Sequence, residues 1–231
     1  MDKRIKLYTV LSSVFLTALI LAEITGGKLI GLQLADSFGF TLTMGVIPFP
    51  VTFIVTDIIN EYYGRRGIRF ITFVGMAMIL MALLVLQIDM LIPATAISPV
   101  TDEAFNAVFG VSIRIIIGSL TAYLVGQLVD IYVFHLIRKR TGGRLLWLRA
   151  TGSTVISQLI DSFIVLFIAF LGQLSVQQIL SIGITNYIYK FGIAVGTTPL
   201  LYLIHDMVDR YLGKEMAQEL MKRAHPETEG Q

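Results

Sequence analysis

The sequence predicts an all-α integral membrane protein, and both its composition and the lengths of its apolar runs support that class. Apolar residues make up 55% of the 231 residues and charged residues only 15%, whereas about a quarter of the residues of a soluble domain carry a charge. So few charged side chains could not cover the surface of a soluble fold. The chain has no cysteine, which excludes disulfides, thiolate metal sites and cysteine nucleophiles.

Six apolar stretches meet or approach the roughly 20 residues that a helix needs to cross the hydrocarbon core. The basic start is followed by an apolar run too long for the core of a signal peptide, so the first stretch is predicted to be a span. We expect a six-helix transmembrane transporter domain over residues 1–212 and a polar cytoplasmic tail over 213–231. The predicted spans cover residues 6–25, 41–61, 69–88, 112–137, 152–172 and 185–208.

The distribution of lysine and arginine predicts how the spans are oriented. Basic residues accumulate in loops that stay in the cytoplasm. Most of the 18 in this chain fall before span one, between spans two and three, between spans four and five, or after span six. Only Lys28 falls in an outer loop. This alternation predicts six transmembrane helices with both termini cytoplasmic.

The long outer link before span four is predicted to contain a short helix. In "SPVTDEAFNAVFG", Thr101 is a candidate cap, and Asp102 and Glu103 stand in the first turn, where carboxylates favour the helix dipole. We expect this short helix to lie on the outer surface. Its apolar stripe would consist of Ala104, Phe105, Val108 and Phe109.

Two short internal echoes raise the question of a duplication, which many transporters carry. One joins "GQLVD" to "SQLID" in spans four and five. The other appears when Pro50 is aligned with Pro199. The same offset also aligns Asp57 with Asp206, Asn60 with Asp209, Tyr62 with Tyr211, and Gly64 with Gly213. Chance similarity stays an alternative, because matches are common in apolar sequence.

Prolines provide a separate indication of irregular backbone. Pro48 and Pro50 fall inside predicted span two, and Pro199 falls inside predicted span six. A proline within a helix removes a hydrogen bond and bends the helix. We expect bent helices here, lining a cavity or forming a packing kink.

Charged side chains within the predicted spans mark the candidate site, because a charge in the membrane is costly and by default suggests function. Residues three apart share a helix face. Three carboxylates each have an amide at that spacing, which suits a planar ligand with several hydrogen-bonding edges. Two cations, Arg114 and Lys190, stand at the outer ends of spans four and six. The three pairs are Asp57 with Asn60, Gln127 with Asp130, and Gln158 with Asp161.

Structural roles compete with this interpretation. Glu61 is expected to pair with Arg65 or Arg66 at the inner surface. Asp206 and Asp209 have Arg210 as a neighbour at the inner interface. For Asp130, Asp161 and Lys190, a buried ion pair that fixes helix register stays an alternative to ligand binding. No metal-ligand spacing, phosphate-binding glycine loop or serine-hydrolase elbow occurs, so an ATP-driven pump on this chain alone is excluded.

Five segments in collinear order resemble the queuosine precursor transporter family, a branch of the vitamin uptake transporters. The resemblance extends from roughly residue 20 to 212. The segments are "FPVTFIVTDIINEYYGRR", "FNAVFG", "RIIIGSLTAYLVGQLVD", "LWLRATGSTVISQLIDSFIVLFIAF" and "YKFGIAVGTTPLLY".

This resemblance implies uptake of 7-deazaguanine compounds, namely 7-cyano-7-deazaguanine and 7-aminomethyl-7-deazaguanine, through the cytoplasmic (inner) membrane of a bacterium or archaeon. It also implies kinship with the six-helix substrate-binding subunits of energy-coupling-factor importers, although members of this branch are thought to work without ATPase coupling subunits. The matching motif positions are Asp57, Asn60, Glu61, Arg114, Gln127, Asp130, Trp147, Arg149, Gln158, Asp161, Lys190 and Pro199.

The predicted chemistry fits such a ligand. A guanine-like base has two adjacent N–H donors that one carboxylate accepts together, and Phe49, Tyr123 or Phe163 is a candidate for stacking on the ring. Asp161 with Gln158 and Asp130 with Gln127 are the expected edge readers. We expect a solitary carrier that needs no cofactor and binds no nucleic acid. Proton coupling and a homo-oligomer stay open, and the alternatives are a binding subunit of a multi-component importer and an intramembrane enzyme using paired aspartates.

Overall fold

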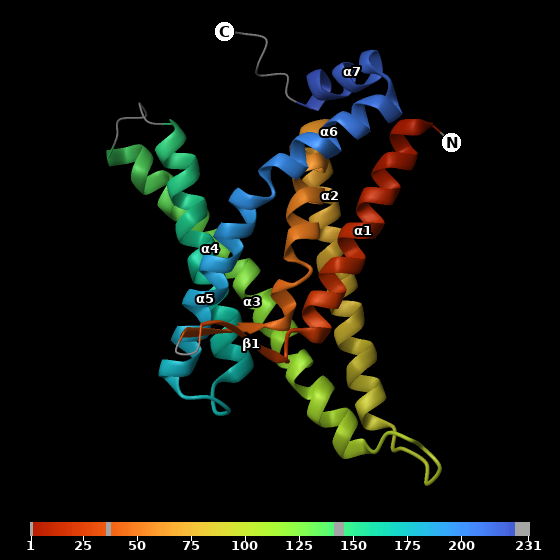
Figure 1. Ribbon diagram of the computed structural model, residues 1–231, viewed down its shortest axis with the longest axis vertical. Coiled ribbons are helices and arrows are strands. Elements are labelled where there is room, and N and C mark those ends of the chain that lie inside the picture. Colours follow the sequence, from red (N-terminus) through yellow and green to blue (C-terminus); the bar gives the residue numbers. More distant parts are fainter. Residues whose placement is uncertain (1, 36–37, 141–145, 225–231) are drawn as a thin grey trace. The chain divides into compact units, whose positions relative to one another are not determined.

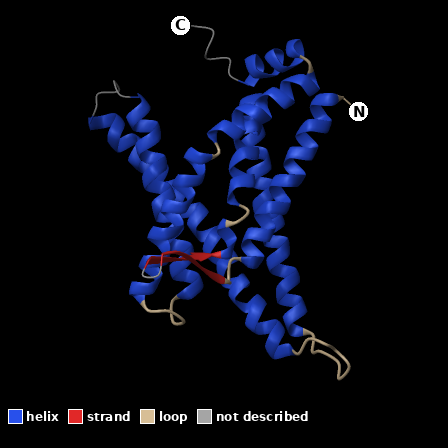
Figure 2. Cartoon of the chain, in the orientation of Figure 1, coloured by secondary structure: helices blue, strands red, loops and turns tan. Residues whose placement is uncertain are grey.

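The computed structural model describes residues 2–35, 38–140 and 146–224, and these are mostly helical (Figures 1 and 2). A two-stranded hairpin interrupts the helices near the N-terminus, largely within the segment between predicted spans one and two. The elements are α1 (Lys3–Thr25), β1 (Leu29–Ala35), β2 (Phe38–Thr43), η1 (Met44–Val46), α2 (Phe49–Leu91), α3 (Asp102–Arg140), α4 (Leu146–Phe170), α5 (Val176–Gly196), α6 (Thr198–Leu212) and α7 (Lys214–Ala224).

Within the described part of the chain, three helical segments are long and apolar enough to cross a membrane, judged by length and composition. They are Lys3–Thr25, Met44–Leu91 and Asp102–Gly126, and a shorter apolar helix covers Leu159–Phe170. The predicted class, a helical membrane protein, is therefore confirmed in this coarser form. The count of six spans and the cytoplasmic termini stay predictions.

The chain divides into two compact units, each with its own core. Unit 1 comprises Met1–Ala22, Gly45–Ala82 and Tyr189–Gln231, and unit 2 comprises Glu23–Met44 and Leu83–Ile188. Each unit is thus assembled from segments that are distant in the sequence.

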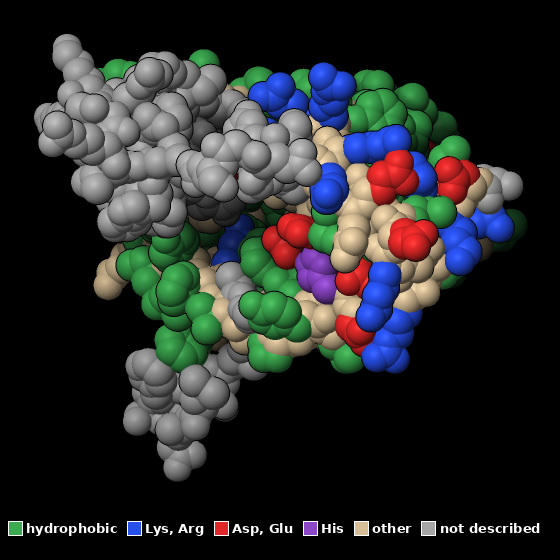
Figure 3. Space-filling view, turned by 90° about the horizontal axis from the view of Figure 1, so that it is seen from above, with side chains coloured by type: hydrophobic (Ala, Val, Ile, Leu, Met, Phe, Trp, Pro, Cys, Tyr) green, Lys and Arg blue, Asp and Glu red, His purple; other side chains and the backbone are tan. Residues whose placement is uncertain are grey.

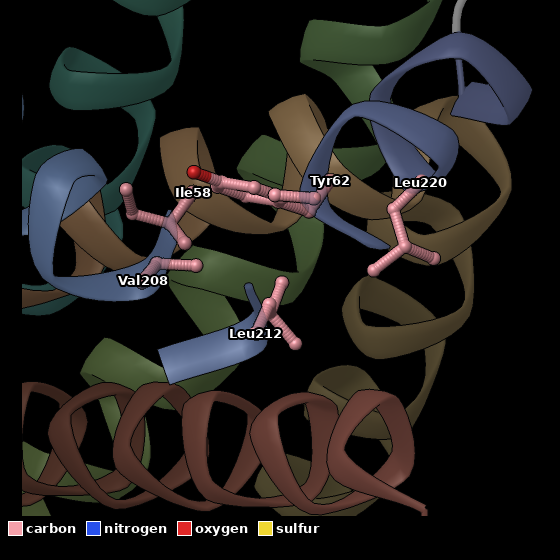
Figure 4. Close-up of a cluster of buried hydrophobic side chains, with 6 residues drawn as sticks. Ile58, Tyr62, Val208, Leu212 and Leu220 are labelled. Carbon is pink, nitrogen blue, oxygen red and sulfur yellow. The ribbon is translucent and has the colours of Figure 1, made fainter. Parts of the chain in front are cut away.

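Unit 1 has an apolar core in which α2, α6 and α7 meet (Figure 4). Ile58 and Tyr62 of α2 pack with Val208 and Leu212 of α6 and with Leu220 of α7. The helix α7 lies within residues 213–231, the part expected to be a polar tail. It is amphipathic, and its apolar side contributes to the core, so this segment belongs structurally to unit 1.

The long helix α2 is two helices joined at Gly64, which has a left-handed backbone (φ 63°). A second core cluster, in which Phe15 of α1 packs with Val55, Ile59 and Ile71, uses both parts of α2. The break corrects one prediction. Glu61 makes no ion pair with Arg65 or Arg66 among the described residues, because Gly64 interrupts the helical register that would place them one turn apart.

The prolines lie at helix starts and not inside helices, which corrects the prediction for span two. Pro48 precedes α2 and Pro50 is its second residue. Likewise α5 ends at Gly196, and α6 begins at Thr198 with Pro199 in its first turn. Proline is favoured there because the first-turn N–H groups have no partner within the helix. The predicted span six is therefore two helices.

Unit 2 is centred on α3 and α4, which pack closely together. A Cβ on Gly118 of α3 would lie 3.1 Å from the carbonyl oxygen of Val165 of α4. Next to this contact, Ile115, Leu166, Phe170 and Ile179 form a core cluster that α5 completes. Small residues at such a position let two helix backbones approach each other, as the packing of membrane helices requires.

The predicted helix after residue 101 exists but is not a separate surface helix. Thr101 caps it, since its hydroxyl oxygen accepts a hydrogen bond from the Ala104 N–H at 3.3 Å. The helix then continues without interruption as α3 from Asp102 to Arg140. The expected break between this helix and predicted span four is therefore wrong, because "GVSIR" contains no proline and one glycine costs a helix only about 1 kcal/mol.

The hairpin of unit 2 is tied to α5 by one buried amide. β1 pairs antiparallel with β2, with Leu29 opposite Thr43. The Asn186 side chain donates from Nδ2 to the Thr43 hydroxyl (3.1 Å), and its Oδ1 accepts from the Thr43 N–H (3.2 Å). Asn186 is only 6% exposed, so both halves of the buried amide are satisfied.

Candidate functional site

The strongest polar cluster of unit 1 joins α2 to α6. The Tyr62 hydroxyl donates a hydrogen bond to Oδ1 of Asp209 at 2.6 Å. His205 lies beside it, with Nδ1 3.3 Å from the Tyr62 hydroxyl oxygen and the two rings stacked at 5.5 Å between centroids. One phenol thus contacts both a carboxylate and an imidazole.

The surrounding packing positions this cluster. Tyr62 is 1% exposed, and Figure 4 shows it among Ile58, Val208 and Leu212. A phenol held in an apolar core needs a hydrogen-bond partner for its hydroxyl. Asp209 supplies that partner from α6.

Asp57 and Asn60 are the only predicted carboxylate–amide pair whose side chains both fall within the described part of the chain. Both are exposed on α2. Asp206, the residue that aligns with Asp57, pairs through Oδ2 with Arg210 at 2.6 Å, and both side chains are mostly exposed. The predicted surface role of Asp206 is confirmed by that contact, whereas the predicted ligand role of Asp57 and Asn60 stays a prediction.

Lys190, the second cation of the candidate site, lies close to an aromatic pair. Its Nζ is 5.5 Å from the centroid of the Phe49 ring, and the Phe49 and Phe53 rings stack at 6.1 Å. A cation at this distance over an aromatic face is attracted to it. The start of α2 and the end of α5 therefore bring a positive charge and aromatic faces together within unit 1.

Arg114 of unit 2 binds the end of α4. Its Nε donates to the carbonyl oxygen of Ile168 at 3.2 Å and its Nη2 to that of Leu171 at 2.7 Å. The last carbonyl groups of a helix have no intrahelical donor, and basic side chains satisfy them favourably. These contacts give Arg114 a structural function at this helix end, and its expected contact with substrate stays a prediction.

Glu23 is a buried carboxylate that the sequence reasoning missed. It lies near the end of α1, is 9% exposed, and accepts a hydrogen bond from the Ser119 hydroxyl at 2.9 Å. About two turns before Ser119 on α3, the Ser112 hydroxyl donates to the carbonyl oxygen of Ile24 at 2.6 Å. The available signal was an acidic residue directly after the apolar run "FLTALILA".

The other predicted readers lie on α3 and α4. Asp161 is half-buried, and the neighbouring Ser162 is buried. Phe163, a candidate for stacking, packs its ring against Gly183 of α5. The side chains of five predicted or matching positions lie outside the described residues, and these are Gln127, Asp130, Trp147, Arg149 and Gln158.

Charged side chains gather on the face seen in Figure 3, which shows lysine and arginine interspersed with carboxylates. Two contacts tie the start of the chain to the last described helices: Arg4 pairs with Glu219 of α7 at 2.9 Å, and Lys3 donates to the carbonyl oxygen of Tyr211 at 2.9 Å. The described ranges contain no group of three His, Asp or Glu side chains that could hold a metal ion.

Comparisons with known proteins identify the group to which the chain belongs. A family profile described as "Putative vitamin uptake transporter" matches residues 43–204. A protein of Bacillus subtilis named "Probable queuosine precursor transporter" is 36% identical over 75% of this chain and 76% of its own length. The "Queuosine precursor transporter" of Escherichia coli is 29% identical over 68% of this chain and 69% of its own length. No solved structure matches the chain.

The family match covers most of the chain, including α2, α3, α4, α5 and the start of α6. It includes the residues that form the cation–aromatic contact, the cap of α4 and the half-buried Asp161. The family consists of transporters and not of enzymes, which agrees with the apolar helices of a multi-pass membrane protein. The chain therefore belongs to the vitamin uptake transporter family, in the group of the queuosine precursor transporters.

Proposed function

We propose that this chain imports queuosine precursors, 7-cyano-7-deazaguanine and 7-aminomethyl-7-deazaguanine, across the cytoplasmic membrane of a bacterium or archaeon, as a solitary carrier. The observation that carries the proposal is the 36% identity to the Bacillus subtilis relative over about three quarters of both chains. That relative's name supplies the substrate class for the proposal.

Side-chain chemistry supports the same substrate class. A 7-deazaguanine is flat, with two adjacent N–H donors on one edge and a carbonyl beside them. A carboxylate accepts two such donors in a charge-assisted pair, and an amide or a cation can bond the carbonyl. We assign edge reading to Asp161 with Gln158 and to Asp130 with Gln127. Asp57, Asn60, Lys190 and Arg114 complete the proposed set of binding residues.

The contact between Lys190 and Phe49 supports an aromatic surface in unit 1 on which such a base could stack. A flat base can stack on an aromatic ring, and alanine substitution at such contacts in nucleic-acid binders costs about 1–3 kcal/mol per base. A cation beside the ring adds a donor for the base carbonyl. Because Phe49 begins α2 directly before Pro50, its position is fixed by the first turn of that helix.

The solitary mode is supported by carboxylates on the predicted spans that can serve both ligand and proton. Uptake of labelled 7-cyano-7-deazaguanine by the purified chain in proteoliposomes, without added ATPase subunits, tests it. Accumulation above protein-free vesicles, abolished by excess unlabelled substrate, is the expected result. Uptake that appears only after ATPase and coupling subunits are added would identify a binding subunit of a multi-component importer.

A further inference from the structure

We propose that Tyr62, His205 and Asp209 form the proton-binding site through which this carrier is coupled to a pH gradient. The inference rests on the proposed function and deepens it, because it names the residues that would take up the coupling ion. The geometry of the three side chains, and not their charge alone, carries the argument.

The first step is the single proton of the Tyr62 hydroxyl. It is donated to Asp209 at 2.6 Å, a distance typical of a hydroxyl bonded to an ionised carboxylate. The hydroxyl also lies 3.4 Å from the carbonyl oxygen of His205, a longer contact. With its proton directed to Asp209, the phenol oxygen can only accept from the third partner.

The second step fixes the tautomer of His205. Its Nδ1 is 3.3 Å from the Tyr62 oxygen. A neutral imidazole carries one N–H and one bare nitrogen. Because the phenol oxygen accepts here, the hydrogen is on Nδ1 and the bare nitrogen is Nε2. His205 is therefore arranged to accept a proton at Nε2 without losing its bond to Tyr62.

The third step is a balanced proton transfer along the three groups. A proton from water adds to Nε2 and gives an imidazolium. The Nδ1 proton then passes to the phenol oxygen while the phenol proton passes to Asp209. His205 ends neutral with hydrogen on Nε2, Tyr62 is unchanged in charge, and Asp209 has become a carboxylic acid. One proton has moved from water to Asp209.

The consequence falls on the contact between α2 and α6. An ionised Asp209 accepts a charge-assisted bond from Tyr62, which is roughly twice as strong as a bond between neutral groups. A protonated Asp209 is neutral, so its hydrogen bond with Tyr62 is no longer charge-assisted and is weaker. Protonation would therefore weaken the contact between two helices that each have a proline in the first turn, Pro50 in α2 and Pro199 in α6.

Other charged groups lie near the cluster, and their contacts bear on the proposed proton transfer. Asp57 and Glu61 on α2 act electrostatically on His205 and Tyr62, respectively. Three contacts of charged groups are made by the other packed elements: Asp206 pairs with Arg210 on α6, Arg4 of α1 pairs with Glu219 of α7, and Lys3 donates to the Tyr211 carbonyl oxygen.

The chain offers matched variants for the test. Asp209→Asn keeps an oxygen that can accept from Tyr62 but cannot take a proton, and Asp206→Asn is its control on the same helix. Tyr62→Phe removes the relay hydroxyl. Tyr211→Phe is its control, because the Lys3 contacts of Tyr211 involve the carbonyl oxygen and the ring.

Uptake of 7-cyano-7-deazaguanine is measured in proteoliposomes with and without an acidic exterior, with a pH-sensitive dye inside to report proton entry. The unmodified chain and both controls should show faster uptake with the gradient and substrate-dependent acidification. In Asp209→Asn and Tyr62→Phe the ratio of the two uptake rates should fall to one, and acidification should be lost.

Each other outcome is decisive. Absence of uptake by the unmodified chain would overturn the proposed function itself. Uptake that ignores the gradient would overturn only the proton site. Variants that lose the same fraction of uptake with and without the gradient, keeping the ratio, would show that the cluster is a structural tie.

Discussion

Gly64 of α2 lies directly against Ala224 at the end of α7: a Cβ at Gly64 would come within 2.7 Å of the Ala224 carbonyl oxygen. Gly64 also has a left-handed backbone with φ 63°. The position therefore requires glycine for two separate reasons, one of conformation and one of space. Gly213, its partner in the internal alignment, shares only the first, with φ 89° and no atom within 4 Å of a built Cβ.

Gly64→Ala should therefore destabilise the protein more than Gly213→Ala. Both replacements cost about 1–3 kcal/mol, because they place a side chain on a positive-φ backbone that essentially only glycine adopts. Only Gly64→Ala must also displace a backbone carbonyl. Thermal unfolding of the two variants in detergent measures the difference. Removing α7 by truncation after residue 213 should bring the Gly64→Ala penalty down to that of Gly213→Ala, and a penalty unchanged by truncation would contradict the contact.

The two glycines also show what the sequence could and could not predict. The alignment of Pro50 with Pro199 and of Gly64 with Gly213 came from the sequence, and the structure gives both pairs equivalent places. Each proline is in the first turn of a helix, and each glycine has a positive φ at the end of that helical segment. The alignment did not predict that Gly64 breaks α2, because its neighbours on both sides favour a helix.

Other features differ in how far the sequence could predict them, according to whether their contacts are local in the chain. The Thr101 cap is local and was predictable, whereas the hairpin depends on Asn186, which lies 143 residues from Thr43 in the sequence. The Tyr62 and Asp209 bond is equally non-local, with a separation of 147 residues. In Arg114, sequence reasoning recognised a costly charge but could not identify the helix end that it binds.

Asn186→Leu should destabilise the attachment of the hairpin to α5. Leucine has the same branched shape as asparagine, with methyl groups in place of the amide oxygen and nitrogen, so it cannot accept from the Thr43 N–H. A buried donor left without a partner costs about 1–3 kcal/mol. We expect faster hydrogen exchange at the Thr43 amide and a lower unfolding temperature. Thr41→Val, at an exposed position of the same strand, is the control and should leave both measurements unchanged.

Arg114→Ala should lower stability by removing both donors to the end of α4. Arg114→Lys keeps the charge but replaces the planar fork with a single donor group, so it should restore only part of the stability. Unfolding temperatures of the three forms give this order. If Arg114→Lys were as stable as the native chain while binding substrate more weakly, the residue would act mainly on the ligand.

Asp161→Asn should abolish or greatly reduce uptake of 7-cyano-7-deazaguanine while leaving the protein folded and inserted in the membrane. An amide replaces one acceptor oxygen with a donor, which opposes the N–H edge of the base, and the charge that strengthens the pair is lost. Losing a hydrogen bond to a charged group costs about 1.5–3 kcal/mol, equivalent to roughly tenfold or more in affinity.

Asp89→Asn, at an exposed end of α2, is the matched control and should transport normally. Substrate affinity is measured by competition with labelled ligand in detergent. The same loss is expected for Asp130→Asn, and native affinity in both variants would place the binding site elsewhere in the protein.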